Sequence, residues 1–393
     1  MKNKIRFSTI KGNSREYVLL VLSLGFVSFC GFVAAWLRYT HGHYITNMTN
    51  AVPWGFPKIV AIYMIGLSAG SLVLSSLSGV FGITEFKIFA RSAALLAALL
   101  LIGALMSIIL DWGRPDRILV PFVHINPRSM FSLDAMFYTA YILTCFVYLW
   151  AMFKEKTELV KRLGVLAIFI AILVHSGTGA IFGFVGAREL YHSPLLPPLF
   201  IASALSSGSA MMVVVMYLTF RWSRRPLDDA LLIRLGSYMA AFLLVAGFFI
   251  FVENVTRAYF PANYEVQRFL LTSGNKYSQI FWVGMVGIGV VLPLGILFNP
   301  ATRQNVGWIL FASALVLAGV LAERYIIVIP AQVFPIDLFP GMKVSSPFMD
   351  GVVAKYSISV VEAFYGLGIF TFVFFLYALA LKFFELLPEG AEK

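Results

Sequence analysis

Cysteine and charged residues are scarce in this chain. Only 2 of the 393 residues are cysteines, Cys30 and Cys145, and they form neither a CxxC pair nor the spacing that binds an iron–sulfur cluster. We therefore expect no iron–sulfur cluster in the chain. Charged residues make up only 12% of the sequence, about half of the share found in soluble domains, and this excludes an ordinary soluble protein.

Histidine is scarce as well, with 5 residues in the whole chain. Haem at membrane depth needs imidazole or similar axial ligands, but only His175 falls inside a long apolar run; His41, His43, His124 and His192 lie in or near polar segments. We therefore expect neither haem nor another metal site in this chain. Two interpretations of His175 stay open: a hydrogen bond between helices, or a ligand to a substrate that exchanges protons.

Apolar residues are abundant: 60% of the chain is hydrophobic and 16% is aromatic. Several runs are long enough to cross about 30 Å of hydrocarbon at about 1.5 Å per helical residue. The sequence therefore predicts an all-α polytopic membrane protein with about ten transmembrane helices. The expected spans are Tyr17–Tyr39, Pro57–Gly82, Ala90–Trp112, Met130–Phe153, Leu163–Val185, Leu196–Phe220, Leu231–Val252, Ser278–Phe298, Val306–Ile329 and Ser357–Phe384.

The net charge of +11 reflects topology rather than nucleic-acid binding, because the basic residues are spread over short connections and form no single basic face. They concentrate in residues 1–16, 154–162 and 221–234. By the positive-inside rule these segments face the cytoplasm. We expect a multi-pass plasma-membrane protein with cytoplasmic tails at 1–16 and 385–393, and longer, Pro-rich outer loops that form a docking surface.

Two nearly identical strings, LSAGS at Leu67–Ser71 and LSSGS at Leu205–Ser209, indicate an internal repeat. Because they lie four spans apart, the repeat is expected to be a parallel duplication. The alternative is that small residues favour close helix packing wherever they occur. The expected domains are an extra helix at 17–39, a four-helix bundle at 57–185, a second four-helix bundle at 196–329 and an extra helix at 357–384.

A polar hinge, DWGRPDR at Asp111–Arg117, follows the third span. A carboxylate at the end of a membrane span is costly unless it is paired or exchanges protons. Asp111 with Arg114 therefore indicates either a functional pocket at the outer membrane face or an interfacial salt bridge that fixes a loop.

Three further carboxylates, Glu253, Glu323 and Glu362, lie near or inside spans. They could relay protons, or each could pair with a neighbouring cation and fix a helix end. We favour pairing for Glu323 with Arg324. Glu253 could pair with Arg257, whereas the helix of Glu362 offers no cation nearby, and both stay candidates for proton transfer.

Five strings together resemble the NrfD/PsrC family, and the resemblance covers nearly the whole chain. They are GHYITNMTNAVPWGFP (Gly42–Pro57), LSAGS, DWGRPDR, NPRS (Asn126–Ser129) and SPLLPPLFIASALSSG (Ser193–Gly208). Family members are haem-free membrane subunits that exchange electrons between quinones and an iron–sulfur partner. The length and the opening string look most like the DsrP branch of sulfur metabolism, with HybB and the membrane subunits of alternative complex III as close relatives.

The resemblance implies a quinone site. Asn50 matches a family Asn that holds the quinone head group, but the accompanying family His falls on Pro53, so that His41 or His43 would replace it. A family Tyr falls on His175, whose imidazole could donate a hydrogen bond to a quinone carbonyl. The expected quinone-binding residues are Asn50, His175, His43 and Trp54; Asp111, Glu253 and Glu362 are expected to transfer protons, supported by the charges of Arg114, Arg128 and Arg257.

The expected function is electron exchange between menaquinol, or another quinone, and an extracytoplasmic ferredoxin-like iron–sulfur subunit. A Dsr-type complex would add a haem c subunit and a second membrane subunit with haem b. Proton translocation is left open. Two alternatives remain: a secondary transporter, which shares parallel repeats and intramembrane carboxylates, and a non-catalytic membrane anchor for such a complex.

Overall fold

The computed structural model describes residues 5–80, 82–335 and 351–389. Within them, 10 helices are long and apolar enough to cross a membrane, and this confirms the expected polytopic membrane protein. The observed spans begin and end within a few residues of those expected from hydropathy. The largest difference is in α8, Asp229–Tyr259, which continues seven residues beyond Val252.

Nine spans are single α-helices and one is composite. The composite eighth span joins α10 (Lys276–Gln279), the π-helical η5 (Ile280–Val291) and α11 (Leu292–Phe298). The others are α1 (Arg15–His41), α2 (Phe56–Val80), α3 (Lys87–Leu110), α5 (Met130–Phe153), α6 (Thr157–Gly183), α7 (Leu196–Trp222), α8, α12 (Val306–Val333) and α13 (Val360–Phe383).

Short elements complete both ends of the bundle. The strands β1 (Phe7–Ser8) and β2 (Leu387–Pro388) pair antiparallel and bring the two tails together. The remaining elements are η1 (His43–Ile45), η2 (Thr84–Phe86), η3 (Pro115–Arg117), α4 (Val120–Val123), η4 (Pro261–Asn263) and α9 (Tyr264–Leu271).

Several helix starts are fixed by side chains that accept backbone N–H groups. Ser14 accepts the amide of Tyr17 at the start of α1. Ser359 and Glu362 form a reciprocal capping box at the start of α13. These caps satisfy N–H groups that have no partner within their own helix, and they place each helix start at a defined residue.

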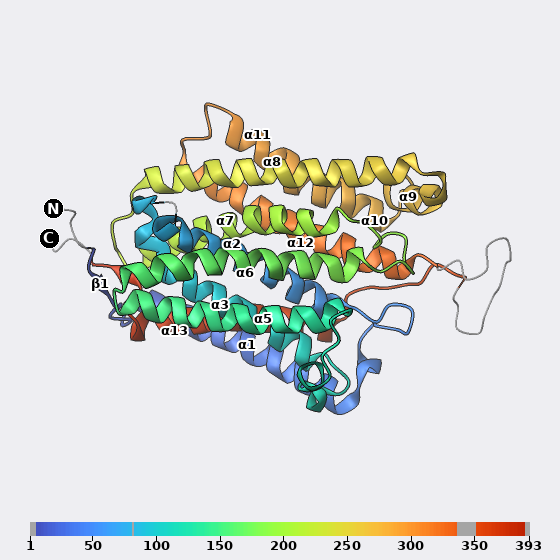
Figure 1. Cartoon of the computed structure of the whole chain (residues 1–393), viewed down its shortest axis with the longest axis horizontal. Coiled ribbons are helices and arrows are strands. Elements are labelled where there is room, and N and C mark those ends of the chain that lie inside the picture. The colour runs from blue at the N-terminus through green and yellow to red at the C-terminus, as the bar shows by residue number, and fades with distance from the viewer. Residues whose placement is uncertain (1–4, 81, 336–350, 390–393) are drawn as a thin grey trace.

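The spans pack in two sets of four. Helix α2 packs against α3 and α6, α5 packs against the same two helices, and α7, α8, α12 and the composite span form the second set. The two sets meet mainly where α2 packs against α7, while α1 and α13 pair with each other beside the first set. Both termini and β1 lie at one end of the molecule, and α9 and α10 lie at the other (Figure 1), which we call the distal face.

The two repeated strings lie against each other where α2 crosses α7. A Cβ atom placed on Gly70 would lie 2.4 Å from the carbonyl oxygen of Ala204, and one placed on Gly208 would lie 2.3 Å from the Cα of Gly70. Only glycine allows the two backbones to approach this closely. The small residues in these strings therefore join the two four-helix sets.

Replacing Gly208 with alanine should destabilise the protein. The added methyl group would overlap the α2 backbone, and overpacking of this kind costs roughly 1–3 kcal/mol. Gly295 in α11 is the matched control, because a Cβ there would meet no described atom within 4 Å. Thermal unfolding in detergent should show a lower midpoint for G208A and an unchanged or slightly higher one for G295A; equal midpoints would show that the crossing tolerates a methyl group.

Candidate functional site

A cavity of about 700 Å³ opens among α2, α3, α5 and α6 near the distal face. Its walls are mainly apolar, as expected of a site for a ligand with a hydrophobic tail. Polar side chains lie in two groups along these walls, which we call the Asp111 cluster and the Asp134 cluster. The lining residues used below are His43, Trp54, Lys58, Ile62, Ile65, Leu105, Asp111, Trp112, Arg114, Asp134, Tyr138 and Thr178.

The Asp111 cluster joins the ends of three helices. The ammonium group of Lys58, in the first turn of α2, lies 2.9 Å from Oδ2 of Asp111 at the end of α3. Arg38 of α1 lies 3.7 Å from Oδ1 of the same carboxylate, and both groups are almost fully buried. Two cations thus face one anion, and Oδ1 accepts no hydrogen bond from any described residue.

His43 completes the Asp111 cluster from η1. Its Nε2 lies 2.9 Å from Nη1 of Arg38. Since a guanidinium group only donates, Nε2 must accept, and the ring proton is assigned to Nδ1. Burial lowers the pKa of His43; Asp111 opposes this change, while the charges of Arg38 and Lys58 add to it. The neutral ring therefore has one N–H group, at Nδ1, that can donate a hydrogen bond.

The Asp134 cluster contains a carboxyl group and two hydroxyl groups. The hydroxyl of Tyr138 donates to Oδ2 of Asp134 at 2.7 Å, and Thr178 of α6 lies 3.2 Å from the same oxygen. Asp134 forms no ion pair with any described cation, and its Oδ1 accepts no hydrogen bond from any described residue. An intramembrane carboxyl group without a countercharge is expensive to keep and marks a functional site.

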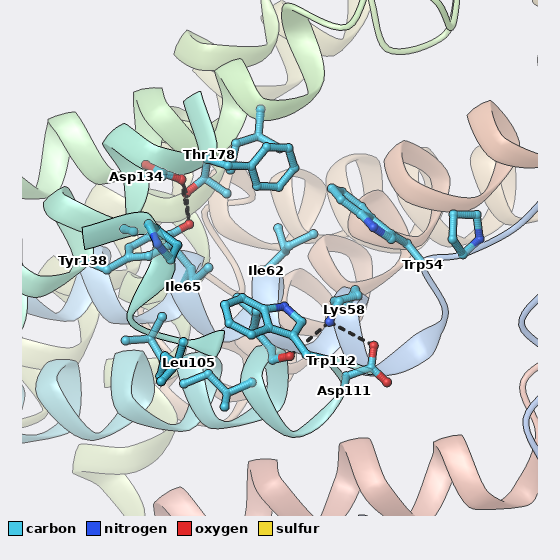
Figure 2. A pocket seen from close by; sticks show the side chains of 18 of the residues that line it. Trp54, Lys58, Ile62, Ile65, Leu105, Asp111, Trp112, Asp134, Tyr138 and Thr178 are labelled. Atoms are coloured by element: carbon cyan, nitrogen blue, oxygen red, sulfur yellow. Dashed lines mark hydrogen bonds and ion pairs between the residues drawn. The ribbon is translucent and has the colours of Figure 1, made fainter. Parts of the chain in front are cut away.

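The two clusters occupy separate parts of the cavity wall, with Ile62 and Ile65 between them (Figure 2). Trp54 closes part of the wall by packing edge-on against Phe182, with 5.5 Å between ring centroids. The arrangement offers an apolar slot with proton-exchanging groups at two separate places.

Four expected site residues line this cavity: His43, Trp54, Asp111 and Arg114. The expected support of Asp111 by Arg114 is wrong, however. Arg114 instead pairs with Asp116, with 2.9 Å between Nη2 and Oδ2, and both side chains are exposed. Residues two apart in one loop can pair in water, whereas Asp111 points back toward α1 and α2.

Asn50 and His175 do not line the cavity, so the expected grouping of both with Asp111 is also wrong. Asn50 is exposed on the loop before α2. His175 is buried, and its ring nitrogens lie 2.9 Å from the carbonyl oxygen of Ala171 and 3.0 Å from that of Ile65. Its geometry matches a hydrogen bond between α6 and α2. Arg128 is exposed and lies outside the cavity as well.

The remaining candidate carboxylates fix local structure. Glu253 lies 2.5 Å from Arg257 and accepts the hydroxyl of Ser193 at 2.5 Å. Glu362 accepts the hydroxyl of Tyr356 at 2.7 Å, together with backbone N–H groups that include that of Ser359. Both carboxylates lie outside the distal cavity.

The expected pairing of Glu323 is confirmed, since Arg324 lies 3.0 Å from its Oε1. Ser203 of α7 also donates to this carboxylate, at 2.7 Å. The pair therefore links α12 to α7 inside the second set of helices.

Lys58, Asp134, Tyr138 and Thr178 were not among the expected site residues. The sequence does contain signals for some of them. Asp134 is a carboxylate inside an apolar run, and Tyr138 follows it at the i+4 spacing that places both side chains on one helix face. Lys58 carries a charge at the start of the second span. No sequence feature shows that Lys58 meets Asp111, since this depends on how α2 packs against α3.

The sequence is similar to a known protein family and to several membrane subunits of redox enzymes. A family model described as polysulphide reductase, NrfD, matches residues 44–336. The protein is 39% identical to the Hdr-like menaquinol oxidoreductase integral membrane subunit of Archaeoglobus fulgidus, over 98% of each sequence. It is 26% identical to the C subunit of polysulfide reductase from Wolinella succinogenes, over 72% of this sequence and 96% of that one.

A third relative is the menaquinone reductase integral membrane subunit of Nitratidesulfovibrio vulgaris, at 24% identity over 79% of this sequence and 80% of that one. Two of these three relatives are thus named for menaquinol or menaquinone chemistry. All three are named as one subunit of an enzyme.

Replacing Asp111 with asparagine should strongly destabilise the protein, because it would leave Lys58 and Arg38 buried without an anion. Breaking a buried ion pair in this way costs roughly 3–5 kcal/mol. Asp116→Asn, which neutralises an exposed carboxylate five residues away, should leave stability unchanged. Thermal unfolding of both variants measures the difference. A large loss of stability in D116N with none in D111N would show that Asp111 is not the carboxylate of the buried ion pair.

His43 should make stability depend on pH. Its pKa in the folded protein lies below the ordinary value of 6.5, so the unfolded chain binds more protons between the two values. The stabilisation is therefore complete above about pH 6.5 and is lost as the pH falls. Between about pH 7.5 and pH 5, the unfolding midpoint of the wild type should fall more steeply than that of His43→Gln. Parallel curves would contradict this assignment.

Proposed function

The chain belongs to the polysulphide reductase NrfD family, and on this premise we propose that it is the quinone-interacting membrane subunit of a respiratory redox complex. In this role it exchanges electrons between menaquinol and an iron–sulfur partner on the distal face, which we take to be extracytoplasmic. The quinone binds in the distal cavity as the substrate.

One observation carries the proposal: the distal cavity combines an apolar slot with two separate groups of proton-exchanging side chains. Quinol oxidation releases two electrons and two protons, so that a site for it needs hydrogen-bonding partners for both ring oxygens and acceptors for the protons. An isoprenoid tail also requires apolar walls. The apolar walls and the two clusters of this cavity support the proposal.

In this proposal each cluster binds or exchanges protons with one end of the quinone head group. At one end, the Lys58 ammonium group and the His43 ring can donate to a quinone oxygen, while Oδ1 of Asp111, which accepts no hydrogen bond from any described residue, can accept a proton. At the other end, Tyr138 can pass a proton to Asp134, with which it is already hydrogen-bonded. Trp54 would pack against the head group, and Asn50 and His175 would have no direct role.

The two electrons must leave through a partner, because we expect no redox centre in this chain. We propose that a ferredoxin-like iron–sulfur subunit docks on the distal loops near the cavity and accepts them. For a Dsr-type complex, which the opening string of the sequence favours, a haem c subunit and a membrane subunit with haem b would join it. We propose no proton relay through Glu253 and Glu362, since local hydrogen bonds hold each of these carboxylates.

A pair of tyrosines on α5 provides the test. Tyr138→Phe removes the hydroxyl that bonds to Asp134, and it should lower the rate of menaquinol oxidation by the purified complex at least about tenfold, since a positioned proton-transfer group contributes roughly 10²–10⁴-fold. Tyr148→Phe is the control: this hydroxyl is also buried, but it donates to the Ser75 carbonyl at 3.2 Å, outside the cavity.

Binding of a quinol-analogue inhibitor, measured by fluorescence quenching, separates binding from turnover. Lys58→Met should weaken this binding about tenfold, or about 1.4 kcal/mol, whereas Tyr148→Phe should not. Unchanged binding and turnover in both Y138F and K58M would place the quinone elsewhere in the complex and would favour the anchor function.

A further inference from the structure

A second, larger cavity of about 970 Å³ lies near the face that carries the two termini. It opens between α1, α7 and α13 and has no residue in common with the distal cavity. Its mouth is formed by the segment that precedes α1 and by the turn that follows α7, around residues 8–14 and 222–225. It therefore lies at the face that we expect to be cytoplasmic.

The body of this cavity is apolar and about one leaflet deep. Its apolar lining includes Leu20 and Leu24 of α1, Leu218 of α7, and Phe370 and Phe374 of α13. From Ser14 to Leu24 the helix rises about 15 Å, which is half of a hydrocarbon core of about 30 Å. A hydrocarbon tail that enters from the membrane would fit between these walls.

Two cations at the mouth have no ion-pair partner among the described residues. Lys11 and Arg224 both line it and are exposed, and their side chains form no ion pair or hydrogen bond within the described part of the protein. The N-terminus of α1 also opens here with the positive end of its helix dipole, which faces Glu16 of the same first turn as well as the cavity. Arg225, by contrast, is occupied, since it donates to the carbonyl oxygens of Pro388 and Thr9 and ties the tails together.

A buried hydroxyl group also lies in the wall of the cavity. Tyr377 of α13 lines the cavity and is only 4% exposed, yet its hydroxyl forms no hydrogen bond of normal geometry with any described residue. Ser92 and Thr219 are its polar neighbours. Tyr377 therefore places a hydroxyl group in the wall of the cavity, beside Thr219, where it can donate to an acceptor atom of a ligand.

We propose that this cavity binds an anionic phospholipid of the cytoplasmic leaflet. The phosphate lies between Lys11, Arg224 and the start of α1, and an acyl tail fills the apolar body, with its ester carbonyl within reach of Tyr377. Basic pockets between membrane helices on the cytoplasmic side suit such head groups. A quinone would leave both cations unused, because its head group is uncharged.

Native mass spectrometry of the purified full-length protein tests the proposal. Phosphatidylglycerol and phosphatidylcholine with identical acyl tails serve as probes, and inorganic phosphate is tested alone. The wild type should retain one phosphatidylglycerol in preference to phosphatidylcholine. The double variant K11Q/R224N should lose this preference by at least about fivefold, which corresponds to about 1 kcal/mol. Asn suits position 224 because Arg224 has a φ of 54°.

Lys154→Gln is the matched control: it removes an exposed cation from the same face but outside the cavity, and it should keep the preference. Tyr377→Phe should weaken retention of both lipids while it leaves the preference for phosphatidylglycerol intact. Equal retention in the wild type and K11Q/R224N, competition by phosphate alone, or recovery of a quinone from this cavity would each overturn the proposal. The first two outcomes leave the assignment of the distal cavity unchanged, whereas recovery of a quinone here would also count against that assignment.

Discussion

The close crossing of α2 and α7 is the constraint on which the rest of the structure depends. Helices in a bilayer gain little from the hydrophobic effect when they associate, so that contact between them relies on close packing and hydrogen bonds. At Gly70 and Gly208 the backbones approach so closely that a Cβ atom on either would overlap the opposite helix. This contact places α2 in the interior, where its side chains reach α3, α6, α7, α12 and α13.

The position of α2 explains why Lys58 can remain buried. A lone ammonium group in such a place would be costly, and even a buried pair seldom repays its full desolvation penalty. Lys58 is held by Asp111 and by the carbonyl oxygen of Ile108, which the packing of α2 on α3 brings within reach. The Asp111 cluster contains two cations, Lys58 and Arg38, and one anion, Asp111. This excess of positive charge favours the binding of electron-rich oxygen atoms in the cavity.

The sequence predicts the spans well because membrane thickness and hydropathy alone determine their length. It predicts the chemistry of the site less well, because partner choice depends on helix rotation. Asp111 could pair with Arg114 by sequence distance, but the end of α3 directs it to Lys58 and Arg38. His175 is the intramembrane histidine expected from its apolar surroundings, yet its ring faces the backbone of α2 instead of the cavity.

Different faces of α2 serve the two cavities. Successive residues of a helix are about 100° apart, so that Ile62 and Ile65 lie within about 60° of each other, while Tyr63 points away from both. Ile62 and Ile65 line the distal cavity, and Tyr63 reaches the cavity near the termini. Because α2 is packed between its neighbours, its rotation about its own axis determines the lining of both cavities. A shift at the Gly70–Gly208 crossing would therefore change the distal cavity and the cavity near the termini at the same time. A substitution on one face of α2 would affect only one of them.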